Sequence, residues 1–112
     1  MMLEYLFGTT IIEKILFYLL VNQKCYPSQL KKVFNLPLYS FQRALGRLEK
    51  GNILISYKEG KTLVYQFNPH YIFLSELKSL LYKAYSFLPE DMRHKYYEPI
   101  ARQKPRRSGK PL

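Results

Sequence analysis

The chain has 112 residues, and 47% of them are hydrophobic, which suits one small domain with a limited core. Its formal net charge of +10 favours an acidic partner, such as nucleic acid or an anionic membrane surface. The single cysteine, Cys25, excludes an intrachain disulfide. No apolar run is long enough to cross a membrane, so we expect no membrane association by a spanning helix.

Positive charge is concentrated in two blocks. Residues 24–61 contain eight Lys and Arg against two Glu, a net charge of +6, and residues 93–112 contain seven against one, again +6. Residues 1–23 and residues 62–92 each carry a net charge of −1. Basic residues that served only solubility would not be segregated in this way, so the first block is the candidate binding region.

The first long helix is predicted over residues 10–21. Thr10 and Glu13 have the spacing of a capping box, and apolar residues cover more than half of the circumference. Such a helix is either central in the core or shared with a second subunit.

Two shorter helices follow. One is predicted over residues 27–34 and begins at Pro27, whose missing N–H costs nothing in a first turn. Asn35, which tolerates the left-handed conformation, marks a turn. The other helix is predicted over residues 39–50, where an i, i+3, i+4, i+7 stripe indicates the face toward the core: Phe41, Ala44, Leu45 and Leu48. The pair indicates a helix-turn-helix.

Residues 53–58 and 62–67 are β-branched and aromatic, and Glu59-Gly-Lys joins them, which predicts a hairpin. A further helix is predicted over residues 71–87, and a short one over residues 89–97. Residues 99–112 are predicted to be a disordered basic tail. The helix over residues 71–87 is expected to turn its apolar side chains toward the core: Phe73, Leu77, Leu80, Leu81, Ala84 and Leu88.

The order helix, helix, helix, hairpin, helix predicts a mainly α fold with a β-hairpin, of the α+β class. This order is that of a winged helix-turn-helix, which we expect over residues 1–88. The chain resembles the compact winged-helix regulators of the ArsR-like and MarR-like kind from about residue 3 to residue 85. The residues that carry this resemblance are Leu6-Phe-Gly-Thr9, Tyr26 to Leu36, Gln42-Arg43, Leu45, Arg47-Leu-Glu49, Glu59-Gly60, Tyr65 and Asn68-Pro69.

The resemblance implies a dimeric bacterial transcriptional regulator that binds double-stranded DNA. Its helix over residues 39–50 would enter the major groove, and the hairpin over residues 53–67 would be the wing. The DNA contacts that follow are Tyr39, Ser40, Gln42, Arg43, Arg47 and Lys50 on that helix, Lys31 and Lys32 on the preceding helix, and Lys58 and Lys61 at the wing tip.

The residue types fit separate roles in such an interface. Gln42 suits an adenine edge, and Arg43 or Arg47 suits guanine. Ser40 and Lys50 suit phosphates. Gly46, inside the same helix, either allows close approach of the DNA backbone or is a local weakness of the helix.

Two other functions stay open. Relatives often carry basic residues along the wing, whereas this wing has Ile55, Tyr57, Leu63 and Val64. That difference favours a winged-helix module that docks onto another protein through its wing and the helix over residues 71–87. An RNA-binding winged helix is the third alternative.

No catalytic grouping is visible, so we expect no enzyme activity and no cofactor. His70, His94 and Cys25 are isolated, and we expect no metal site. Cys25 is either a redox switch or, as its lone position favours, a small core filler. The basic tail is either a minor-groove arm or a solvated segment. We expect a cytoplasmic, nucleoid-associated protein in a bacterium or archaeon, dimeric through the helices over residues 10–21 and 71–87.

Overall fold

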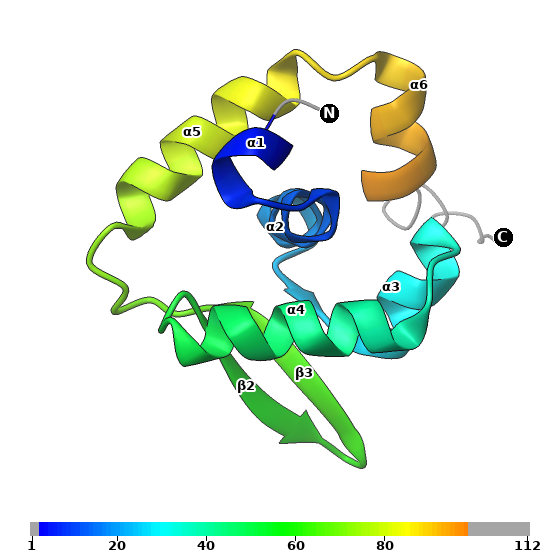
Figure 1. Ribbon diagram of the computed structural model, residues 1–112, viewed down its shortest axis with the longest axis vertical. Coiled ribbons are helices and arrows are strands. Elements are labelled where there is room, and N and C mark those ends of the chain that lie inside the picture. Colours follow the sequence, from blue (N-terminus) through cyan, green and yellow to red (C-terminus); the bar gives the residue numbers. More distant parts are fainter. Residues whose placement is uncertain (1–2, 99–112) are drawn as a thin grey trace, which may run out of the picture.

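The computed structural model describes residues 3–98, so the tail predicted to be disordered lies outside the described residues. The fold combines helices with a small antiparallel sheet of strand order β1-β3-β2, whose hairpin projects at one edge of the molecule, which confirms the α+β class (Figure 1). The elements are α1 (Glu4–Phe7), α2 (Thr10–Asn22), β1 (Lys24–Cys25), α3 (Pro27–Phe34), α4 (Leu38–Lys50), β2 (Leu54–Glu59), β3 (Thr62–Phe67), α5 (Leu74–Ser86), α6 (Glu90–Met92) and the π-helical turn η1 (Arg93–Tyr97).

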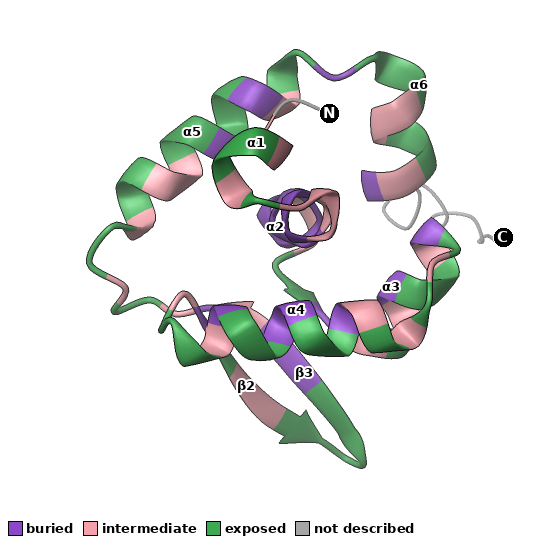
Figure 2. Ribbon diagram, viewed as in Figure 1, coloured by how far each residue is buried: buried purple, intermediate pink, exposed green. Residues whose placement is uncertain are grey.

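Helix α2 is the centre of the molecule. Ile12, Glu13 and all residues from Ile15 to Leu20 are buried, and no residue of α2 is exposed (Figure 2). Seen end-on, α2 lies between α5 on one side and α4 with the hairpin on the other (Figure 1). The packing of α2 therefore fits the first of the two predicted roles, a helix central in the core. Dimerisation through the helices over residues 10–21 and 71–87 stays a prediction.

The start of α2 differs from the predicted capping box. Thr9, not Thr10, is the N-cap, and its Oγ1 accepts a hydrogen bond from the Ile11 N–H at 2.8 Å. Glu13 is buried and accepts a hydrogen bond from the Leu3 N–H at 3.2 Å. The carboxylate thus ties the segment before α1 to the central helix.

Helices α3 and α4 form the predicted pair. Asn35 ends α3 in the left-handed conformation, at φ 55°, and the chain re-enters a helix at Leu38. The predicted apolar face of α4 is confirmed, because its four members are all buried: Phe41, Ala44, Leu45 and Leu48.

The hairpin is confirmed, and a third strand was not predicted. Gly60, at φ +62°, provides the positive φ that a tight turn between β2 and β3 needs. On the other side of β3, Lys24 pairs with Gln66 and Cys25 pairs with Tyr65. A strand of two residues is too short to produce a periodic sequence pattern, so nothing in the sequence indicated a strand at Lys24 and Cys25.

Helix α5 is shorter than predicted and buries a narrower face. Leu81, Ala84 and Leu88 are buried as expected. Phe73 and Leu80 are 56% and 37% exposed, so their predicted burial is wrong. The core covers one flank of α5, and these two side chains lie outside that flank.

The segment over residues 89–98 packs onto the core. Tyr97 is 2% exposed, and the Asn22 side-chain amide donates to its carbonyl oxygen at 2.9 Å. The Tyr96 ring stacks on Phe34, with 5.4 Å between centroids. Aromatic contacts therefore join η1 to the end of α3. Among the described residues, no helix has both the length and the apolarity to cross a membrane.

The burial of one face of α4 in the core predicts how two substitutions on this helix affect stability. Leu45 is 0% exposed, so Leu45→Ala should lower the free energy of unfolding by about 2–5 kcal/mol through lost burial and a cavity. Gln42→Ala, on the exposed face of the same helix, should change it by less than about 0.5 kcal/mol. Urea denaturation followed by circular dichroism measures both. Equal effects of the two variants would contradict the orientation of α4.

Candidate nucleic-acid interface

The outer face of α4 is the most cationic helix face that the structure describes. It is opposite the buried stripe, so the same amphipathic pattern that fixes the core also fixes this face. We call it the α4 outer face, and its exposed members are Tyr39, Gln42, Arg43, Gly46, Arg47 and Lys50. All five of the side-chain-bearing members were predicted as DNA contacts.

The one acidic residue of α4 does not belong to this face. Glu49 is half-buried, and its Oε2 accepts a hydrogen bond from the Ser56 hydroxyl of β2 at 2.6 Å. This bond joins the end of α4 to the hairpin and directs the carboxylate away from solvent. The α4 outer face consequently has three cations and no carboxylate.

Two of its side chains are arranged by each other. The Arg43 guanidinium lies over the Tyr39 ring, 5.5 Å from the centroid, as i, i+4 neighbours on a helix allow. This contact extends the guanidinium along the surface of the helix. Within the described part of the chain, neither Arg43 nor Arg47 forms an ion pair with a carboxylate.

Two of the hollows that border α4 divide the predicted contact residues. One, of about 230 Å³, lies toward the start of α2. The other, of about 440 Å³, lies between α4, the start of α3 and the hairpin. The first brings together Tyr39, Ser40, Arg43 and Arg47, and the second brings together Gln42 and Lys61 with Ser28, Thr62 and Leu63.

Ser28, Thr62 and Leu63 were not among the predicted contacts. Ser28 is in the first turn of α3, and Thr62 and Leu63 begin β3. Only the tertiary fold brings these segments together, although a Ser beside the predicted helix start at Pro27 was a local signal.

Four predicted contacts lie outside both hollows. Lys31 and Lys32 are exposed in the last turn of α3, Lys58 is exposed on β2, and Lys50 is exposed at the end of α4. Ser40 is half-buried. Together these side chains widen the cationic surface without converging on one point.

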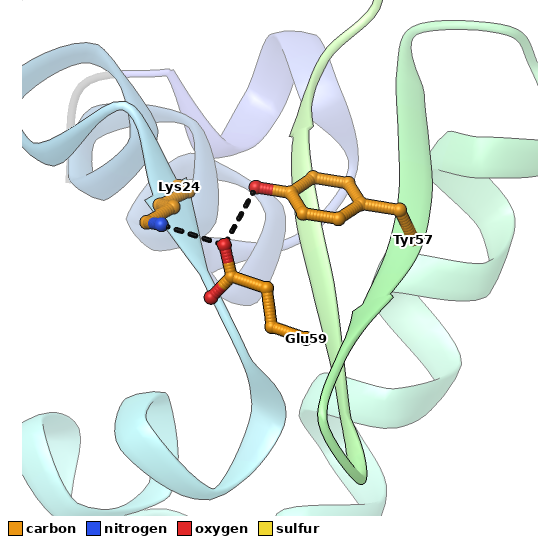
Figure 3. A network of polar contacts seen from close by, with 3 residues as sticks. All are labelled: Lys24, Tyr57 and Glu59. Atoms are coloured by element: carbon orange, nitrogen blue, oxygen red, sulfur yellow. Dashed lines mark hydrogen bonds and ion pairs between the residues drawn. The ribbon is translucent and has the colours of Figure 1, made fainter.

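The hairpin carries a local charge pair that the sequence did not indicate. The Glu59 carboxylate lies between the Lys24 ammonium, at 2.8 Å, and the Tyr57 hydroxyl, at 3.4 Å (Figure 3). The hydrogen bond with Lys24 lowers the pKa of Glu59 and raises the pKa of Lys24. Glu59 thus pairs with Lys24, and within residues 3–98 it forms no salt bridge with the neighbouring Lys58 or Lys61.

Three apolar residues of the hairpin, Ile55, Tyr57 and Val64, share one face, but Val64 is buried, and Leu63 lies on the other face. Ile55 pairs with Gln66, and Leu63 pairs with Lys58. Ile55 and Lys58 are three residues apart on one strand, so Ile55 and Leu63 point to opposite faces of the sheet. They are 36% and 39% exposed.

No atom of residues 3–98 requires a glycine at position 46. A Cβ added to Gly46 would meet nothing within 4 Å, and its φ is not positive. Glycine inside a helix costs about 1 kcal/mol relative to alanine. The chain therefore carries a local cost in the middle of the α4 outer face without an internal steric reason.

Cys25 is a core side chain at 1% exposure, and burial raises the pKa of its thiol to about 12. Its thiolate is therefore scarce at neutral pH, which disfavours a redox switch. Among residues 3–98, no three His, Cys, Asp or Glu side chains are grouped closely enough to hold a metal ion.

The chain was compared with known proteins at three levels. No family model, no curated protein and no solved structure matches it.

The burial of Cys25 predicts its reactivity. At pH 8, iodoacetamide should alkylate Cys25 at least about a hundredfold more slowly in the folded protein than in guanidinium chloride, because the thiolate is the nucleophile. Mass spectrometry of quenched time points measures the rate. Equally fast labelling of folded and unfolded protein would contradict the burial of Cys25 in the core.

Proposed function

We propose that the chain is a winged helix-turn-helix protein that binds double-stranded DNA as a transcriptional regulator. In this proposal α4 enters the major groove, and β2 with β3 forms the wing. The observation that carries the proposal is the α4 outer face, where Arg43, Arg47 and Lys50 are exposed and the only acid of the helix is turned away.

The dimensions of α4 support this placement. At about 1.5 Å per residue, its 13 residues extend about 20 Å, and a helix fits the major groove, which is about 12 Å wide. The net charge of +6 over residues 24–61 is on the segment that contains α3, α4 and the hairpin. Phosphate attraction therefore favours the same surface that presents the side chains for bases.

The side chains of the α4 outer face would divide the work. Arg43 and Arg47 would donate to guanine edges, and Gln42 would pair with adenine. Tyr39 would hold Arg43 along the groove through their stacked contact. Lys50, at the end of the helix, would contact a phosphate.

The hollow beside the wing would receive the DNA backbone. Lys61 and Thr62 border it from the hairpin, and Ser28 borders it from α3. A phosphate there would accept hydrogen bonds from both sides, and Leu63 would contact the deoxyribose. Lys58, Lys31 and Lys32 would add contacts to the flanking phosphates.

Docking onto a protein through the wing has less support, since Ile55 is the one exposed apolar residue among the three that share its face, and Leu63 lies on the opposite face. RNA is the other possible ligand of a cationic helix face. Competition of labelled duplex DNA with unlabelled duplex or structured RNA tells the two nucleic acids apart, because an A-form major groove is too narrow for α4.

Arg43 provides the direct test. Arg43→Ala should lower the affinity for the preferred duplex by about 1–3 kcal/mol and remove the preference at one base pair, because a bidentate guanine contact is lost. Lys14→Ala, which removes a cation from α2 outside the basic segment, is the matched control and should leave binding unchanged. Fluorescence anisotropy with duplexes that vary at single positions measures both.

The outcome against the proposal is equally clear. If Arg43→Ala binds every duplex as the unchanged protein does, α4 is not the helix that contacts the bases. Because Arg43 is exposed and its cation–π partner is on the same helix, the substitution should leave folding intact.

Gly46 gives a test with two opposite effects. Gly46→Ala should raise the free energy of unfolding by up to about 1 kcal/mol, because no atom obstructs the new methyl group. It should also weaken DNA binding, because in the proposed complex the added methyl group projects from the α4 outer face toward the DNA backbone. Thermal denaturation and anisotropy separate the effects. Greater stability with unchanged affinity would show that DNA does not approach the helix closely at this point.

A further inference from the structure

A mainly apolar hollow of about 370 Å³ lies where α1, α2, α4 and α5 meet. Ile12, Leu16 and Leu48 of its lining are buried, whereas Leu6 is 65% exposed, so the hollow runs from the core to the surface. Of the described residues that line it, Arg47 alone is charged. Its volume is within the range of small-molecule sites, about 300–1,000 Å³. We call it the apolar hollow.

A second hollow adjoins the first and is polar. It is the hollow of about 230 Å³ between the start of α2 and α4, and Ile12 and Arg47 line both. Arg43, Ser40 and Thr9 also line it, and no Asp or Glu is among its described lining residues. We call it the polar hollow. It presents two guanidinium groups and several hydroxyls, with no carboxylate to oppose an anion.

The joined hollows thus separate apolar lining from cationic donors. A purely apolar ligand would leave the guanidinium groups without an acceptor, and a small inorganic anion would leave the apolar hollow unfilled. A ligand that matches both has an apolar chain and a compact anionic head. A carboxylate suits the head, because it accepts paired, charge-assisted hydrogen bonds from a guanidinium.

We propose that the two hollows bind a free medium-chain carboxylate. Its alkyl chain would lie in the apolar hollow, and its carboxylate would accept hydrogen bonds from Arg47 and Arg43 in the polar hollow. Arg47 is the side chain that joins the two parts, because it lines both hollows.

Both arginines can serve a ligand as donors. Within the described part of the chain, neither of them forms an ion pair with a carboxylate. The Arg43 guanidinium lies over the Tyr39 ring, 5.5 Å from the centroid. A guanidinium stacked on a ring keeps its in-plane N–H groups for an acceptor. The contact with Tyr39 is therefore compatible with a bound carboxylate.

The bound carboxylate would compete with DNA, a consequence that rests on the proposed function. Arg43 and Arg47 are the proposed guanine contacts, so a carboxylate paired with them withdraws them from the bases. The coupling is reciprocal, and a bound duplex would weaken carboxylate binding by the same factor. The ligand would thus release the protein from its DNA site.

A ligand series tests the site without DNA. Isothermal titration calorimetry of the full chain should detect decanoate, and octanoate and hexanoate should bind about tenfold more weakly for each two methylenes removed. The reason is that each buried methylene strengthens binding roughly three- to fourfold. Octan-1-ol, which has the chain of octanoate without its charge, should bind at least about tenfold more weakly than octanoate.

Three variants locate the carboxylate. Arg47→Gln and Arg43→Gln should each weaken octanoate binding about tenfold and leave octan-1-ol binding unchanged, because only the carboxylate needs the guanidinium. Lys83→Gln is the matched control, since it removes an exposed cation of α5 that lines neither hollow, and it should leave octanoate binding unchanged. All three side chains are exposed, and circular dichroism verifies that the variants are folded.

Three calorimetric results would overturn the site. The first is no binding of decanoate at up to about 1 mM. The second is an affinity that does not change with chain length, and the third is an equal loss caused by Lys83→Gln.

The competition has its own measurement. Saturating decanoate should raise the dissociation constant for the preferred duplex at least about tenfold, and an unchanged constant would overturn the competition. Because the calorimetry contains no DNA, a chain that binds decanoate but no duplex refutes only the proposed function. A chain that binds a preferred duplex but no carboxylate refutes only the ligand site.

Discussion

Burial of α2 on all sides is the constraint on which the rest of the structure depends. A helix whose side chains from Ile15 to Leu20 are all buried needs partners around its circumference, and α1, α4, α5, β1 and η1 supply them. Helix α4 buries one stripe in this packing and keeps its opposite face in water. The same requirement thus directs the cations of α4 outward, while Leu80 of α5 stays exposed.

The two exposed faces are consequently on opposite sides of the molecule. The α4 outer face has cations and hydrogen-bonding groups, while Leu80 of α5 and the flanking Phe73 and Phe87 are exposed apolar side chains. Two polar contacts hold carboxylates near the hairpin. Ser56 holds Glu49 away from the cations of α4, and Lys24 holds Glu59 at the hairpin. The two faces therefore differ in chemistry.

Periodic patterns made much of the fold predictable. The stripe of Phe41, Ala44, Leu45 and Leu48 located the core face of α4, and therefore also its outer face, from spacing alone. The hairpin was predictable because two β-branched and aromatic runs are joined by a short turn that contains Gly60. Strand β1 was missed because two residues have no period.

Burial within a wide apolar helix was harder to predict. The spacing of α5 did not distinguish the flank that packs in the core from Phe73 and Leu80, which face solvent, because both sets are apolar. For α2 the sequence left the core and a subunit interface open, and the central position of α2 became visible only in the packing of the chain. The convergence of Ser28, Gln42 and Lys61 around one hollow likewise requires the tertiary fold, since they belong to three separate elements.

The central claim is that the α4 outer face recognises a DNA sequence. Selection of bound duplexes from a random pool at about 150 mM salt tests it most directly, because phosphate attraction alone is weakened there and favours no sequence. The account predicts enrichment of one motif, arranged as an inverted repeat with half-sites about one helical turn apart. A pool that emerges from the selection with no enriched motif would contradict it.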